Sequence, residues 1–148
     1  MKIVVQRVKS SSVIVDKKIV GNVGNGLMLL VGFTEGDNSE VIDYMIKKVL
    51  ALRIFDDAAG VMNKSIMDVG GSILSISQFT LYADATKGNR PSYVKALKSD
   101  EATKLYDEFN KKLSESIHVE TGIFGAEMLV NIENDGPVTI ILERWLYV

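Results

Sequence analysis

A short turn-forming segment near the C-terminus limits the folds open to this chain. Asn134-Asp135-Gly136-Pro137 separates two runs, residues 127–133 and 138–145, that are rich in residues suited to a pleated sheet. A hairpin connection is the simplest interpretation of such a tetrad. However, two-residue hairpins favour Asn-Gly or Asp-Gly, and a proline removes a backbone donor where the second strand must begin. The segment therefore indicates either an irregular hairpin or a loop with a role beyond turning.

Length and composition are those of one ordinary globular domain. The 148 residues are 47% hydrophobic and 24% charged, which is enough for a hydrophobic core and typical of a water-soluble protein. No apolar run is long enough to cross a bilayer, and the apolar stretch at the N-terminus is too short for a signal peptide. We therefore expect a single domain over residues 1–148, located in the cytoplasm and without membrane contact.

The composition also excludes several kinds of site. Cysteine is absent, which rules out disulfides, thiolate metal sites and a cysteine nucleophile. The single histidine, His118, leaves little room for a histidine metal site, and we expect neither a metal nor a cofactor. The net charge is −2, so any nucleic acid must be held by a local basic patch.

Hydrophobic periodicity predicts an α/β order of elements. Besides the two C-terminal runs, strands are expected at residues 2–8, 12–15, 18–23, 27–31, 53–55, 72–77 and 118–121. Helical spacing predicts one helix that begins at Asp37, with a capping box between Asp37 and Glu40, and a second that is capped at Ser99. The order favours a single α/β domain with a mixed, mostly antiparallel sheet and two flanking helices.

From the residues alone, no complete catalytic constellation is visible. A serine–histidine–aspartate triad would need His118, which directly follows the second helix and more simply begins a strand. Ser77 and Thr80 could act as nucleophiles, but neither has a base nearby in the sequence. Arg7 shares a strand face with aliphatic residues, so its guanidinium either reaches water at the strand end or needs a partner.

Five segments together resemble the D-aminoacyl-tRNA deacylases, also called D-tyrosyl-tRNA deacylases. They are residues 5–8 (VQRV), 77–81 (SQFTL), 87–92 (KGNRPS), 121–128 (TGIFGAEM) and 134–139 (NDGPVT). Each is weak by itself, but all five occur in this order across essentially the full chain. The resemblance implies a sheet curled into a barrel-like layer and a homodimer. It also implies hydrolysis of the ester between a D-amino acid and the terminal adenosine of tRNA, with glycyl-tRNA accepted as well.

The resemblance also assigns roles to particular residues. Gly136 and Pro137 match a Gly-cis-Pro motif that reaches into the partner subunit's pocket and excludes L-amino acids, and Arg7 would hold this loop in place. The catalytic pocket for the adenosine and the scissile ester would be lined by Ser77, Gln78, Phe79 and Thr80. Another part of the substrate-binding wall would be formed by Phe124, Gly125, Ala126 and Met128.

Such a site needs no triad. An aminoacyl ester is already activated, so positioning and oxyanion stabilisation by backbone N–H groups around Phe79 and Thr80 are sufficient in principle. The family is thought to use the ribose 2′-hydroxyl of the substrate in activating water. The phosphates of tRNA would meet a few basic residues, Lys87, Arg90, Lys95 and Lys98.

Two other functions stay open on the sequence. One is a non-catalytic module that binds a nucleotide or small metabolite in the same pocket. The other is a structural oligomerisation domain in which the Gly136-Pro137 loop serves only a dimer contact. Deacylation of charged tRNA separates the first from an enzyme. For the second, a saturating adenosine analogue should leave the melting temperature unchanged, because a ligand of the native state must stabilise it.

Overall fold

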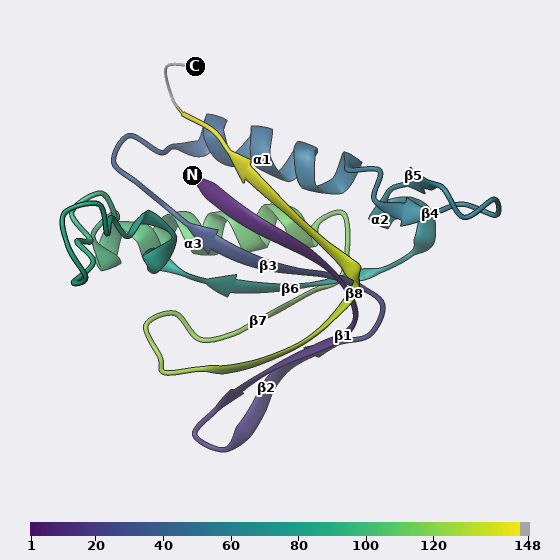
Figure 1. Ribbon diagram of the computed structural model, residues 1–148, viewed down its shortest axis with the longest axis horizontal. Helices are drawn as coiled ribbons and strands as arrows, with labels where there is room; N and C mark the ends of the chain where they lie inside the picture. Colours follow the sequence, from purple (N-terminus) through teal and green to yellow (C-terminus); the bar gives the residue numbers. More distant parts are fainter. Residues whose placement is uncertain (146–148) are drawn as a thin grey trace.

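One mixed sheet of six strands organises the fold, which a computed structural model describes for residues 1–145 (Figure 1). The strands are β1 (Lys2–Val15), β2 (Lys18–Val23), β3 (Gly26–Gly32), β6 (Ser72–Ser77), β7 (Val119–Thr121) and β8 (Leu129–Glu143). Neighbours follow the order β2-β1-β3-β6-β7, and β8 also pairs with β1. The β3–β6 and β6–β7 pairs are parallel, and the three pairs made by β1 are antiparallel.

The sheet curls until its two edges nearly meet. β1 pairs with β3 along its first half and with β2 along its second half, so β2 can bend back toward β7. The Asn22 N–H donates to Glu120 Oε1 at 3.4 Å, and a Cβ on Gly21 would lie 2.7 Å from the Thr121 carbonyl oxygen. Gly21 therefore permits the close approach of β2 and β7. The expected barrel-like layer is confirmed.

The two C-terminal runs form one strand rather than a hairpin. Residues 129–134 pair with the second half of β1 and residues 139–143 with its first half, so β8 follows β1 end to end (Figure 1). Val8 pairs with Asn134 and Gln6 with Thr139, which leaves residues 135–138 bulged opposite the single residue Arg7. The Gly136-Pro137 peptide bond within this bulge is cis, as the motif resemblance implied.

Two hydrophobic cores form on the two faces of the sheet. Helices α1 (Ser39–Ala51) and α3 (Ser99–Ser114) cover one face, and the other lies inside the curl (Figure 1). Leu27 and Leu29 of β3 belong to the helix-covered core, whereas Met28 belongs to the inner core. The apolar run at 27–31 is thus a strand buried on both faces, because a strand so covered has no polar side.

The segment expected to be only turns contains regular structure. It holds β4 (Phe55–Asp56), β5 (Met62–Lys64) and the short helix α2 (Ile66–Val69), so residues 1–145 contain three α-helices rather than the two expected. A capping box starts α2: Ser65 Oγ accepts from the Asp68 N–H, and Asp68 Oδ2 accepts from the Ser65 N–H. Farther along, Phe79–Tyr82 form the 3₁₀ helix η1, although the sequence suggested a β-like segment there.

Both predicted helix caps are wrong by one residue. Asn38 caps α1 by accepting from the Val41 N–H, while Asp37 accepts from the Met1 amine and the Thr34 N–H, each at 2.8 Å. The buried positive charge of that amine is a stronger partner for the carboxylate than a neutral helix amide. Helix α3 begins after Lys98, which makes no side-chain cap bond, so Ser99 lies inside the helix.

Within residues 1–145, none of the helices has the length and apolar character needed to cross a bilayer.

Candidate active site

A pocket of about 530 Å³ opens where the parallel strands β3 and β6 end. Because the strands run in the same direction, their last residues and the segments that follow them gather at one edge of the sheet. The loop before β8 and the start of α3 complete the wall. Seven of the eight residues expected in this pocket line it: Ser77, Gln78, Phe79, Phe124, Gly125, Ala126 and Met128.

Thr80, the eighth expected residue, lies beside the pocket rather than in its lining. Its side chain is exposed, and its hydroxyl accepts a hydrogen bond from Gln78 Nε2 at 2.5 Å. The Gln78 backbone is fixed in turn, because its N–H donates to the Val31 carbonyl of β3 at 2.8 Å. The pair therefore links the end of β3 to the first turn of η1.

The pocket mouth carries an aromatic pair that sequence reasoning only half identified. Phe79 and Tyr93 meet edge to face with ring centroids 5.2 Å apart, and their exposed fractions are 56% and 45%. Tyr93 was missed because it lies in a loop with no periodic pattern. Its place depends on long-range contacts: Thr34 pairs with Ala96, and Leu97 N–H donates to the Phe33 carbonyl.

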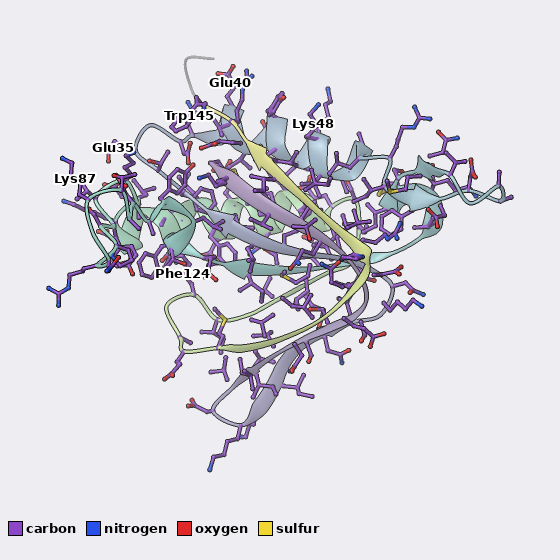
Figure 2. All side chains as sticks on the ribbon, viewed as in Figure 1. Glu35, Glu40, Lys48, Lys87, Phe124 and Trp145 are labelled. Atoms are coloured by element: carbon purple, nitrogen blue, oxygen red, sulfur yellow. The ribbon has the colours of Figure 1, made fainter. Side chains whose placement is uncertain are left out.

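The loop next to the mouth supplies the basic residues expected to meet tRNA phosphates. Lys87, Arg90, Lys95 and Lys98 are all exposed. Figure 2 shows Lys87 at the same end of the molecule as Phe124 of the pocket. An Asp84–Ser92 bridge closes the base of this loop, with both backbone bonds at 2.8 Å.

Asp84 stabilises the start of the same loop. Its Oδ1 atom accepts from the Thr86 hydroxyl at 2.7 Å and from the Thr86 N–H at 3.0 Å, and Lys95 Nζ lies 4.0 Å from Oδ2. The pKa of Asp84 lies below its ordinary value of 3.8. The bond from the Thr86 hydroxyl lowers it most, and the bond from the Thr86 N–H has the next largest effect. The carboxylate is therefore charged at neutral pH.

The Gly136-Pro137 loop lies at the other end of the sheet. It bulges opposite Arg7, which pairs with Leu27 near the start of β3, whereas the pocket begins at Val31. Val31 lies four positions after Leu27, which is about 13 Å along the strand. Figure 1 shows β8 bending sharply near its middle, away from the loop that follows η1. Gly136 and Pro137 are exposed, and neither contributes to the pocket of its own chain.

Arg7 does not reach open water but holds this loop. It is 9% exposed, and its Nε atom donates to the Asp135 carbonyl at 3.2 Å. Its Nη1 atom donates to the Ile54 carbonyl at 2.8 Å and lies 3.6 Å from Asp56 Oδ1. A Cβ on Gly136 would lie 3.0 Å from Arg7 Nη2, so a larger residue would press on the guanidinium. Arg7 thus joins the loop to the segment that follows α1.

The pocket offers dipoles rather than charges to a ligand. Among residues 1–145, no Asp, Glu, Lys, Arg or His contributes to its lining. His118 is outside it, exposed, and 3.0 Å from Glu120 Oε2. The same residues hold no group of three or more His, Asp or Glu side chains placed to bind a metal ion. Any chemistry performed by the protein's own groups in this pocket therefore relies on backbone amides, hydroxyls and the Gln78 amide.

Comparison with known proteins places the chain among related structures and sequences. The chain is similar to the solved structure of a c-Myc DNA unwinding element binding protein, with 40% identity and a TM-score of 0.93 over 97% of this chain and 99% of that one. It is also similar to a probable eukaryotic D-amino acid tRNA deacylase, with 18% identity and a TM-score of 0.82 over 95% and 97% of the two chains. That second likeness concerns the fold alone. The model of the D-Tyr-tRNA(Tyr) deacylase family matches residues 4–143, and on the strength of that nearly complete match the chain belongs to this family of hydrolases.

Proposed function

We propose that this D-aminoacyl-tRNA deacylase works in the cytoplasm as a homodimer whose subunits complete each other's sites. In each site, the pocket of one subunit would take the terminal adenosine and the ester, and the Gly136-Pro137 loop of the other would exclude L-amino acids. The same enzyme would hydrolyse glycyl-tRNA. The proposal rests on one observation: within a single chain, the Gly136-Pro137 loop and the pocket lie at opposite ends of the sheet.

The pocket suits the aminoacylated end of tRNA. Its volume of about 530 Å³ is in the range of small-molecule sites. The rings of Phe79 and Tyr93 are exposed, and the face of either ring is a surface on which a base can stack. Lys87, Arg90, Lys95 and Lys98 would then contact phosphates of the acceptor end from the neighbouring loop.

Hydrolysis in this pocket would proceed by positioning and by stabilising the oxyanion. The first N–H groups of a helix have no partner within it, so those of Phe79 and Thr80 at the start of η1 can donate to the ester oxygen as it gains charge. Water would attack the ester carbonyl with the substrate's own 2′-hydroxyl assisting, and the bond to the ribose oxygen would break. The uncharged lining supports this proposal because it contains no side chain suited to act as a strong base.

The loop would act as a backbone filter in the partner's pocket. A wall of main-chain atoms blocks one configuration at Cα whatever the side chain, whereas side-chain contacts would select among amino acids. Glycine has no side chain to clash with such a wall, so glycyl-tRNA would pass. Such a wall must be rigid, and the bond from Arg7 Nε to the Asp135 carbonyl would keep it so.

Release of labelled amino acid from D-tyrosyl-, L-tyrosyl- and glycyl-tRNA tests the proposal. We expect cleavage of the D and glycyl substrates and little cleavage of the L form. Arg7→Lys should keep the D activity and raise L cleavage, because the single nitrogen of a lysine does not reproduce the two nitrogens, Nε and Nη1, that bond the Asp135 and Ile54 carbonyls. Binding without release would instead favour the non-catalytic module, and equal rates on D and L substrates would exclude the filter.

Loss of single hydroxyls provides a test of the chemistry. Ser77→Ala and Thr80→Ala should retain appreciable deacylation, because neither oxygen is proposed to attack the ester. Replacing the terminal 2′-hydroxyl of the tRNA by hydrogen should cost more than either substitution. An acyl-enzyme trapped on Thr80 would contradict the proposal, since removal of a true nucleophile eliminates most of the acceleration.

A further inference from the structure

The end of β6 lacks a strand partner at the residue that enters the pocket. Ile73 N–H donates to the His118 carbonyl and Gly122 N–H donates to the Ser75 carbonyl, so alternate residues of β6 face β7. The register joins Ile73–Ser75 to Val119–Thr121 and ends there. Ser77 is the next residue whose backbone faces that side, and it lies two positions beyond the last pair.

Tyr106 of α3 binds β6 at Ser75, the last residue that pairs with β7. Its phenol O–H donates to the Ser75 carbonyl at 2.7 Å, and the residue is only 3% exposed. Burial raises the pKa of the phenol above its ordinary value of 10. Its ring also packs against Phe124 of the pocket wall, with centroids 5.8 Å apart.

We propose that Tyr106 is a positioning residue for ester hydrolysis: its hydroxyl holds the Ser75 carbonyl and its ring packs against Phe124, and together these contacts fix the pocket segment that begins at Ser77. On the β3 side, this segment is held by the bond from Gln78 N–H to the Val31 carbonyl. On the β7 side, the Tyr106 hydroxyl and the Gly122 N–H both donate to the Ser75 carbonyl, two residues before Ser77. The inference rests on the proposed role of residues 77–80 in the reaction.

A phenol is well suited to this task. Its hydroxyl donates to a backbone carbonyl while its ring packs against an aromatic neighbour. Removing the hydroxyl would take a hydrogen bond from the carbonyl of the buried Ser75, and buried backbone groups that lose partners are costly. Ala102, one helical turn before Tyr106, lines the pocket directly, so α3 meets the pocket at these two positions.

Tyr106→Phe tests the inference, with Tyr82→Phe as a matched control. Both tyrosines are buried, but the Tyr82 hydroxyl has no hydrogen-bond partner among residues 1–145. With D-tyrosyl-tRNA, we expect Tyr106→Phe to lower kcat by about tenfold, the usual scale for a group that orients a reacting one, and to leave KM little changed. Tyr82→Phe should match the wild-type kcat and KM.

A third variant separates positioning from stability. Phe109→Leu creates a gap in the core three residues farther along α3 and keeps the Tyr106 hydroxyl, so it should destabilise the fold while keeping kcat at a temperature far below the melting point. An equal fall of kcat in Phe109→Leu and Tyr106→Phe would overturn the inference, as would a wild-type kcat in Tyr106→Phe. A wild-type enzyme without activity on D-tyrosyl-tRNA would instead defeat the proposed function itself.

Discussion

At the scale of single residues, Arg7 shows how one side chain can settle a local conformation. Its guanidinium joins the carbonyls of Asp135 and Ile54, which lie on segments far apart in the chain. The planar fork of arginine holds donors on separate nitrogens in fixed directions, whereas the donors of a lysine all lie on one nitrogen at the end of a flexible stem. Periodicity placed Arg7 on an apolar face and left its partner open, because the partner comes from a bulge that no strand pattern describes.

Arg7→Ala should lower the free energy of unfolding by about 2–3 kcal/mol, because the carbonyls of Asp135 and Ile54 would lose their hydrogen-bond donor in a largely buried environment. Asp56 and Asp135 are partly exposed and add little to this figure. Urea denaturation measures the change. Arg53→Ala is the control, because Arg53 makes one exposed bond to the Asn63 carbonyl and should cost no more than about 0.5 kcal/mol. Equal losses in both variants would contradict the role given to Arg7.

Asp84 gives a prediction for acid pH. Its pKa is lowered in the folded protein by the two bonds from Thr86, so its stabilising contribution is fully present above the unfolded value near 3.8. The contribution should be lost as the pH falls through the lower folded value. Asp84→Asn should therefore unfold more easily than wild type at pH 7, and the difference should vanish toward pH 2. Thermal unfolding across that range measures it, and a difference that grows toward acid pH would be contrary to this sign.

At the scale of elements, β3 and η1 approach each other closely in the pocket wall. A Cβ on Gly32 would lie 3.0 Å from the Gln78 carbonyl oxygen and 3.2 Å from Leu81 Cβ. A methyl group there would have to push the start of η1 outward. The two elements therefore meet at a glycine because only its absence of side chain allows η1 to sit directly on the strand end.

Gly32→Ala should consequently lower kcat/KM on the order of tenfold, because small displacements of positioning groups are costly in rate. Its effect on the free energy of unfolding should be about 1–3 kcal/mol, the range for overpacking. Gly24→Ala is the matched control: its Cβ would meet nothing within 4 Å, so activity should be unchanged. Deacylation kinetics and urea denaturation of both variants check the pair, and wild-type kinetics in Gly32→Ala would show that η1 does not depend on this contact.

Local pattern predicted the elements whose environment is uniform along their length. The apolar run in β3 was sufficient because a core covers each of its faces, and the helical spacing of α1 and α3 was sufficient because each helix turns one apolar side to the same core. The hairpin alternative at residues 134–137 failed because β1 is long enough to pair with both C-terminal runs. The Asp37 cap failed because the carboxylate has a charged partner 36 residues away.

The candidate site followed the same rule. Segments with distinctive motifs, such as residues 77–79 and 124–126, were brought together as the resemblance implied. Tyr93 and Tyr106 were not anticipated as site residues. Tyr93 depends on a loop tied to Thr34 and Phe33, and Tyr106 looks like an ordinary apolar helix position until the end of β6 is known.

At the scale of the whole molecule, the loop and the pocket belong to opposite ends of a single sheet. A two-fold dimer would place each loop at its partner's pocket, so each site would draw on both chains. This predicts that two differently damaged chains can repair each other. One is Arg7→Ala, with a released loop and an intact pocket, and the other is Ala126→Trp, with an intact loop and a filled pocket.

Mixing these variants under conditions of subunit exchange should reduce cleavage of L-tyrosyl-tRNA. In an equal mixture, about half of the open pockets would face an intact loop, and an excess of Ala126→Trp should raise that share further. The control partner is the double variant Arg7→Ala, Ala126→Trp, which supplies no intact loop and should leave L cleavage unchanged. The rate of L-tyrosyl-tRNA cleavage is measured before and after mixing. A mixture whose rate equals the sum of the rates of the separate variants would exclude action across the dimer.

Because the loop of one chain is proposed to fit the pocket of another, the way in which the chains associate determines the size of the assembly. Head-to-tail contact would join a loop to a pocket and still leave one of each unfilled at the ends, which is the condition for ring or filament growth. Two-fold contact fills both pockets at once and leaves no growing end. The bulge within β8 would therefore limit the size of the particle as well as the choice of amino acid, and a protein that lost the two-fold contact but kept the loop would tend to form fibres.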